Sequence, residues 1–124
     1  MILADTSVWV DHLRSGNAEL QILLDRDDVL THAFVIGELM LGGVGDDILA
    51  DLRALPLAAQ AATGEVEALI KSASLVGRGI GYVDAALLAS VLLHRAQLWT
   101  LDRRLASAAD DLSAARGSSP RCRG

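Results

Sequence analysis

Two aspartates follow apolar, strand-like segments near opposite ends of the chain. Asp5 comes directly after the apolar residues 2–4, and Asp102 comes directly after residues 99–101. If both segments are parallel strands of one sheet, the two carboxylates lie at its carboxyl edge, where open α/β folds bind their ligands. Taken singly, each aspartate is more simply explained as the N-cap of the helix that follows.

Two further acids stand in otherwise apolar helical segments. Glu38 lies within the apolar residues 33–41, and no lysine or arginine stands one helical turn away from it. A buried carboxylate is costly unless a cation meets it or its pKa changes, so the alternative is a head group that reaches solvent. Asp84 opens a predicted helix, and the first turn of a helix favours an anionic side chain even without a function.

The four acids together indicate a chemistry that none of them indicates alone. They belong to four separate elements, which the predicted fold brings to one edge: Asp5, Glu38, Asp84 and Asp102. Oxygen-only clusters of this kind bind Mg²⁺ or Mn²⁺. Such ions promote phosphodiester cleavage by lowering the pKa of bound water and by stabilising the leaving oxygen. The histidines share no motif and are assigned to surface or core roles: His12, His32 and His94.

The elements that must position these acids alternate along the chain. Strands are predicted at 1–4, 29–31, 56–58 and 98–101, and helices at 7–13, 20–26, 33–41, 46–55, 64–75, 82–96 and 103–112. Short apolar strands that alternate with helices form parallel sheets covered on both faces. With right-handed crossovers, the fold class is therefore α/β, a three-layer α/β/α sandwich with a short parallel sheet.

Length and composition fit one domain in a reducing compartment. The chain has 124 residues, of which 52% are hydrophobic and 22% charged, and we assign residues 1–112 to the domain. Residues 113–124 form a tail rich in arginine, serine and glycine that we expect to be disordered. The single cysteine, Cys122, excludes a disulfide framework and a cysteine-based zinc site. Without a membrane-spanning run or a signal peptide, we expect a cytoplasmic protein.

The charge balance limits the kind of nucleic-acid contact that the chain can make. A net charge of −5 argues against a general nucleic-acid binder. Ten of the eleven cationic residues are nevertheless arginine, the side chain best suited to bidentate contact with phosphate.

The ordered motifs resemble the PIN domain and, more narrowly, the VapC toxins of bacterial toxin–antitoxin modules. The resemblance rests on Ile-Leu-Ala-Asp-Thr-Ser at 2–7, on Glu38 in a small apolar helix, on Gly-Ile-Gly-Tyr-Val-Asp at 79–84 and on Leu-Trp-Thr-Leu-Asp at 98–102. It covers residues 1 to about 112 in the expected order and spacing. Each motif is weak alone, whereas the ordered four are specific. The tail that follows matches nothing in the family.

The resemblance implies a function and a set of partners. Members are Mg²⁺- or Mn²⁺-dependent endoribonucleases, usually homodimeric, which a cognate VapB antitoxin inhibits. By resemblance, the four acids form the catalytic and metal-binding quartet, and Thr6 or Ser7 supplies the hydroxyl that orders it. Four arginines are candidates to rim the site for RNA phosphates, with a plain solvated surface as the alternative: Arg14, Arg78, Arg103 and Arg104. The RNA would be read as an exposed single-stranded loop.

Two other phosphate-handling folds and one non-catalytic module are the alternatives to a nuclease. A haloacid-dehalogenase-type phosphatase needs a second aspartate where this chain has Ser7, and a receiver domain needs a late lysine where this chain has only the mid-chain Lys71. A PIN-like fold kept as a protein- or RNA-binding module is the remaining alternative. Four converging acids argue against it, because they bring such a module no benefit.

Overall fold

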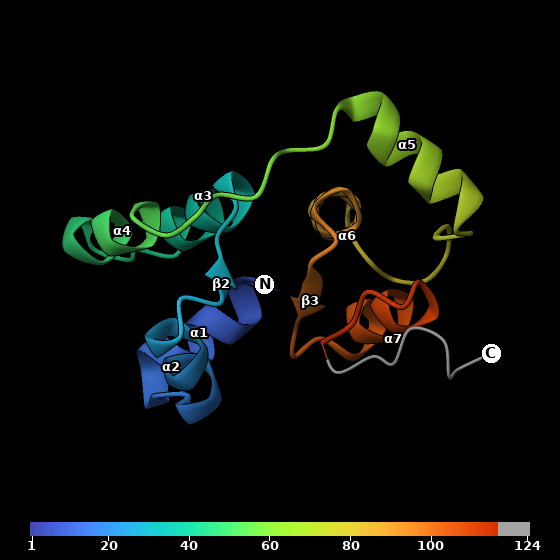
Figure 1. Cartoon of the computed structure of the whole chain (residues 1–124). Helices are drawn as coiled ribbons and strands as arrows, with labels where there is room; N and C mark the ends of the chain where they lie inside the picture. The colour runs from blue at the N-terminus through green and yellow to red at the C-terminus, as the bar shows by residue number, and fades with distance from the viewer. Residues whose placement is uncertain (117–124) are drawn as a thin grey trace.

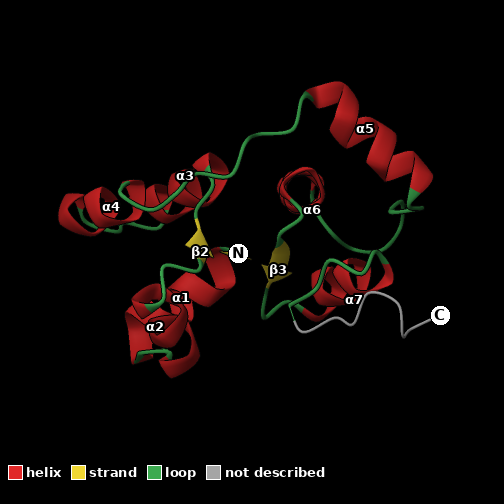
Figure 2. Ribbon diagram, in the orientation of Figure 1, coloured by secondary structure: helices red, strands yellow, loops and turns green. Residues whose placement is uncertain are grey.

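Seven helices and three short strands make up the part of the chain, residues 1–116, that the computed structural model describes (Figure 2). The strands are β1 (Ile2–Ala4), β2 (Val29–Leu30) and β3 (Gln97–Trp99). The helices are α1 (Thr6–Ser15), α2 (Ala18–Asp25), α3 (Ala33–Leu41), α4 (Asp46–Arg53), α5 (Thr63–Ser72), α6 (Tyr82–His94) and α7 (Arg103–Asp111).

The three strands form one parallel sheet in the order β2-β1-β3, with Leu3 opposite both Leu30 and Leu98. The first crossover moves from β1 to β2, and the second moves back past β1 to β3. Right-handed crossovers in opposite directions lie on opposite faces of a sheet. Figure 1 shows this arrangement, with α1, α2 and α7 on one side of the strands and α3 to α6 on the other. The predicted α/β sandwich is confirmed.

The core is built from the strands and from α6, which crosses the centre of the molecule. Every residue of α6 from Ala85 to Val91 is buried, as expected for a helix that is apolar on all sides. All three residues of β1 are buried as well. The sheet edge that carries Asp5 therefore rests on a rigid apolar base.

The predicted strand at 56–58 is reduced to an isolated parallel bridge between Thr31 and Leu57. The Thr31 N–H donates to the Pro56 carbonyl and the Ala58 N–H donates to the Thr31 carbonyl, both at 2.8 Å. Proline has no N–H of its own, so pairing cannot extend on that side. The predicted strand at 98–101 also ends earlier, at Trp99, so that Asp102 follows a two-residue loop rather than the strand itself.

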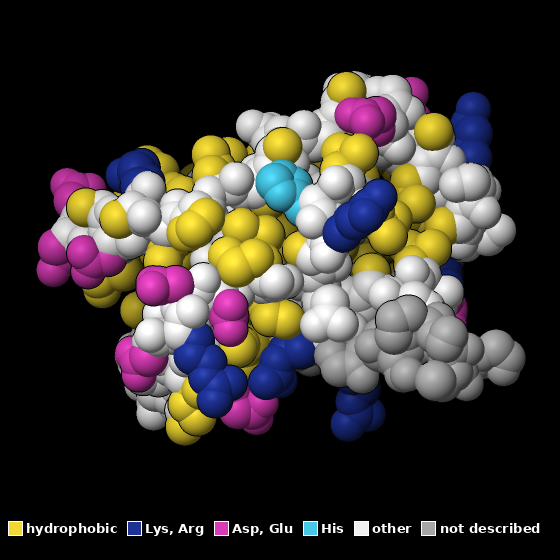
Figure 3. All heavy atoms as spheres, viewed as in Figure 1, with side chains coloured by type: hydrophobic (Ala, Val, Ile, Leu, Met, Phe, Trp, Pro, Cys, Tyr) yellow, Lys and Arg dark blue, Asp and Glu magenta, His cyan; other side chains and the backbone are white. Residues whose placement is uncertain are grey.

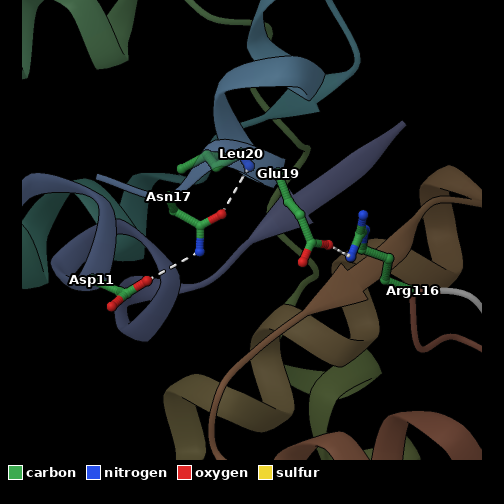
Figure 4. A network of polar contacts seen from close by, with 5 residues as sticks. All are labelled: Asp11, Asn17, Glu19, Leu20 and Arg116. Carbon is green, nitrogen blue, oxygen red and sulfur yellow. Dashed lines mark hydrogen bonds and ion pairs between the residues drawn. The ribbon is translucent and has the colours of Figure 1, made fainter. Parts of the chain in front are cut away.

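A contact at the other sheet edge was not predicted. Leu98 pairs in parallel with Ala115, and Arg116 lies 4.5 Å from the centroid of the Trp99 ring. Figure 4 shows the Arg116 guanidinium paired with Glu19 of α2 at 2.7 Å. The same view shows Asn17, which caps α2 by accepting the Leu20 N–H. Residues 113–116 of the predicted tail are thus part of the fold, and residues 117–124 lie outside the described residues.

Candidate functional site

Asp5 lies at the junction of β1 and α1, where it is 5% exposed. Its Oδ1 accepts the Val8 N–H at 3.2 Å, which makes it the N-cap of α1, and the Ser7 hydroxyl at 2.5 Å. Its own N–H donates to the Trp99 carbonyl of β3 at 3.0 Å. Burial raises the pKa of the Asp5 carboxyl above its ordinary value. Asp5 is therefore an N-cap, as the simpler explanation predicted, but capping alone does not explain why this acid is buried.

Glu38 presents its head group to solvent from α3, as the alternative reading of the sequence predicted. Its Oε1 accepts the Thr6 hydroxyl at 2.5 Å, although 32 residues separate the two in the chain. This contact joins the first turn of α1 to α3. Glu38 is thereby directed toward the end of β1 that carries Asp5.

Asp84 is half-buried in the first turn of α6, and its Oδ2 accepts the Gly81 N–H at 3.2 Å. Burial is the largest cause of the raised pKa of the Asp84 carboxyl. The negative charges of Asp5, Asp102 and Glu38 raise this pKa further, whereas the hydrogen bond from Gly81 lowers it. The charges of the three other acids predicted from the sequence therefore all influence Asp84.

Asp102 is the N-cap of α7, because its Oδ1 accepts the Arg104 N–H at 2.8 Å and the Leu105 N–H at 3.2 Å. The loop before it is held by two hydroxyls. Thr100 accepts the Asp102 N–H at 3.0 Å, and Ser7 accepts the Leu101 N–H at 2.9 Å. Ser7 thus connects Asp5 to the segment that carries Asp102.

Thr100 is the residue of this region that sequence reasoning missed. Its hydroxyl lies 3.4 Å from the Ser7 hydroxyl, and it also lowers the pKa of Asp5 against the larger effect of burial. A hydroxyl two residues before an acid, at the end of a strand, is the signal that was available in the sequence.

The oxygen donors of this region suit a hard divalent cation, although the side chains do not point at a common position where an ion could bind. The region offers only oxygen donors, which Mg²⁺ and Mn²⁺ prefer. Among residues 1–116, no three Asp, Glu, His or Cys side chains are close enough together to hold a metal ion as they stand. Each carboxylate instead accepts a hydrogen bond from a hydroxyl or a backbone N–H, which stabilises its charged form. Coordination would therefore require these side chains to rotate toward one another.

The four candidate arginines do not share one environment. Arg103 and Arg104 are exposed in the first turn of α7, next to Asp102. Arg14 lies at the far end of α1, roughly 13 Å along the helix axis from Asp5 at ~1.5 Å per residue. Arg78 pairs with Asp111 at 2.8 Å and donates to the Ser107 hydroxyl at 3.1 Å. Arg14 therefore lies farther from Asp5 along α1, and Arg78 is already engaged within the protein, whereas the rim for RNA phosphates stays a prediction.

The histidines have structural contacts, as predicted. His12 accepts the Asn17 N–H, and His94 accepts the Ala59 N–H. His32 is fully buried, where it caps α3 by accepting the Phe34 N–H and lies 3.0 Å from the Ser90 hydroxyl.

The acids lie apart from two apolar cavities. One of about 270 Å³ is lined mainly by residues of α1, α2 and α4, and one of about 440 Å³ by residues of α3 with Arg53 and Leu57. Neither is lined by any of the four carboxylates. A polymer substrate needs an accessible edge rather than an enclosed pocket, so the acids and not these cavities form the candidate site.

Comparisons with known proteins connect this arrangement to a described family. A family model described as the PIN domain matches residues 2–111. Ribonuclease VapC32, in two strains of Mycobacterium tuberculosis, is 46% identical over 114 residues, which cover 87% of this chain and 90% of the relative. The crystal structure of FitAcB from Neisseria gonorrhoeae aligns with a TM-score of 0.62 and 23% identity, over 89% of this chain and 94% of the other.

Proposed function

The chain belongs to the PIN-domain family, and from that premise we propose that it is a VapC-type endoribonuclease toxin that hydrolyses RNA at its four carboxylates. The relationship to a protein named as a ribonuclease supports the activity. The assignment of the site is supported by hydrogen bonds that join the segments bearing the acids: Thr6 donates to Glu38, and Ser7 contacts both Asp5 and the Leu101 N–H. The raised pKa of Asp84, to which the charges of the other three acids contribute after burial, agrees with it.

We propose that Asp5, Glu38, Asp84 and Asp102 hold one or two Mg²⁺ or Mn²⁺ ions. When bound, such an ion lowers the pKa of a water molecule and stabilises the leaving oxygen of the phosphodiester. The protein's own contribution is orientation. Ser7 fixes the Asp5 carboxylate, and Thr6 fixes Glu38. Asp5 is the buried ligand in this proposal. Burial disfavours its negative charge, and a bound cation would offset that cost.

The direct test is cleavage of single-stranded RNA with and without divalent cations. Activity should disappear in EDTA, return with Mn²⁺ or Mg²⁺, and be lost in Asp84→Asn. A matched control is Asp27→Asn in the exposed turn before β2, since asparagine tolerates the positive φ of 57° at that position. Unchanged cleavage in EDTA would refute the proposed chemistry. A protein that binds RNA without cleaving it would instead support the binding-module alternative.

We further propose that a VapB-type antitoxin inhibits the chain in the cytoplasm. Its C-terminal segment would cross the acidic site, where an arginine side chain forms charge-assisted hydrogen bonds with the carboxylates. Co-expression of the chain with such an antitoxin should yield a complex without RNase activity. A purified chain that remains fully active at saturating antitoxin would contradict this part of the proposal.

We also propose a homodimer. Figure 3 shows many hydrophobic side chains exposed on one face of the molecule. Among the described residues, the exposed hydrophobic side chains include Leu41 at 91%, Leu57 at 58% and Leu93 at 53%. Covering such surface in a second copy removes apolar area from water. Light scattering at micromolar concentration should therefore give twice the mass of 13.1 kDa, and a monodisperse monomer would refute the dimer.

Among the helices of residues 1–116, none combines the length and the hydrophobicity that a membrane span requires.

A further inference from the structure

The loop between α5 and α6, residues 73–81, is fastened to α7 at two points. At the first, Arg78 forms its ion pair with Asp111 and its hydrogen bond with Ser107. At the second, the Arg104 side chain lies over Gly79, so closely that a Cβ at Gly79 would be 2.7 Å from the Arg104 Cδ. Gly79 has a φ of +79°, so it suits this position both by its conformation and by its lack of a side chain.

Each of the two fastened segments carries one of the acids. The loop ends at Gly81, which caps α6 and donates its N–H to Asp84. Helix α7 begins after Asp102, whose carboxylate accepts the Arg104 N–H. In the chain, α6 and β3 separate the two acids. The contacts between the loop and α7 are therefore a second, direct connection between their backbones.

We propose that Arg78 is a positioning residue, which sets the spacing between Asp84 and Asp102 by holding the loop against α7 and so tunes the affinity for the divalent cation. This inference rests on the proposed function. The Arg78 side chain is 27% exposed and uses both terminal nitrogens on α7. Contact with an RNA phosphate would require it to give up these bonds. The geometry thus assigns to Arg78 a role different from the phosphate contact that its sequence position suggests.

Asp111 allows the two roles of Arg78 to be separated. Its side chain is 61% exposed at the last position of α7, about nine residues and roughly 13 Å along the helix from Asp102. Replacement of Asp111 therefore removes the ion pair without touching the acidic site. If Arg78 positions the loop, Asp111→Ala should behave like Arg78→Ala. If Arg78 contacts RNA, Asp111→Ala should instead release it for that purpose.

The experiment measures two quantities. The first is the Kd for Mn²⁺, obtained from the spectroscopic signal of the unbound ion, and the second is the affinity for RNA in EDTA. Arg78→Ala and Asp111→Ala should each raise the Kd for Mn²⁺ by about 3- to 10-fold, at or below the low end of the effects of outer-shell partners. The reversed pair, Arg78→Asp with Asp111→Arg, should return the Kd to within about twofold of the original, because it restores the ion pair. RNA affinity in EDTA should change in none of them.

Each outcome bears on the proposal. Unchanged Mn²⁺ affinity in both single variants, or RNA affinity lost in Arg78→Ala alone, would overturn it while leaving the proposed nuclease intact. If the original chain binds no Mn²⁺, the proposed function itself fails, and this inference fails with it. If Arg78→Ala does not fold, Asp111→Ala and Ser107→Ala decide the matter, since both remove exposed side chains. Ser107→Ala should give the smaller loss, because it removes a single hydrogen bond.

Discussion

Asp5 combines two roles that conflict in the absence of a cation. As the N-cap of α1 it stabilises the helix, but as a buried acid it pays for desolvation, which raises its pKa. A raised pKa means that the acid favours folding when protonated and that this stability is lost as pH rises through the folded-state pKa. The ionised form of Asp5 therefore contributes less to the stability of the metal-free fold than the protonated form does.

Replacing Asp5 by asparagine separates these roles. Asparagine keeps the cap and removes the charge, so the metal-free melting temperature should rise, by about 4 °C for each kcal/mol recovered. Cleavage should be abolished, and the stabilisation by Mn²⁺ should shrink. Thermal melts of both proteins in EDTA and in Mn²⁺ test this expectation. Equal shifts with Mn²⁺ in the two proteins would show that Asp5 is not a ligand.

His32 predicts a pH dependence of stability that is independent of the acids. Burial lowers its pKa from the ordinary value of 6.5, and its Nδ1 must stay unprotonated to accept the Phe34 N–H. A lowered pKa means that its contribution is complete above pH 6.5 and is lost as pH falls toward the folded-state pKa. The free energy of unfolding should fall below pH 6.5 by up to about 1.4 kcal/mol per pH unit.

The measurement is a series of denaturant titrations from about 1.5 pH units below to about one unit above the ordinary histidine pKa of 6.5. The control is His32→Asn, which keeps a side-chain cap for α3 but does not titrate. Its stability should be nearly flat over this range. An undiminished slope in His32→Asn would assign the pH dependence to other groups.

Among the helices, α7 is the one whose first turn combines an acid of the site with exposed arginines that RNA can contact. Its first turn carries Asp102 as the cap and the exposed Arg103 beside it. An exposed arginine next to the acids can neutralise an RNA phosphate, whereas Arg14 stands at the far end of α1, roughly 13 Å along the helix from Asp5. RNA binding through α7 should therefore depend on salt.

Arg103→Ala should weaken RNA binding and make the slope of log affinity against log salt shallower by about 0.7, the value for one contact with single-stranded phosphate. Arg14→Ala is the matched control and should leave both quantities unchanged. Titrations of RNA at several salt concentrations, in EDTA, provide the measurement. Equal slopes for the two variants would show that Arg103 is only a solvated residue.

Most of the helices and strands of the whole molecule could be predicted from the alternation of apolar and polar residues. The strand at β1 and the helix over α3 follow directly from that pattern, and the acids at Asp5 and Asp84 stand where strand and helix boundaries were expected. Such local signals are strong because burial of a continuous apolar run leaves few alternatives.

The remaining features depend on contacts between distant residues. The pairing of Leu98 with Ala115, the ion pair of Arg78 with Asp111 and the hydrogen bond of Thr6 with Glu38 each join segments far apart in the chain. No local pattern specifies such pairs, because they depend on which faces the tertiary fold brings together. For the same reason, the sequence could not distinguish an engaged arginine from one available to RNA.

We propose that the four carboxylates act as one divalent-cation site, and direct binding of Mn²⁺ is the simplest test of this site. Asp84 is the acid whose pKa responds to the other three, so its removal should disturb the whole set. The free-ion signal should show that the original chain and Asp27→Asn bind Mn²⁺ with the same affinity, and that Asp84→Asn binds it about tenfold more weakly or worse. Equal affinity in all three proteins, or no binding by the original chain, would contradict the account.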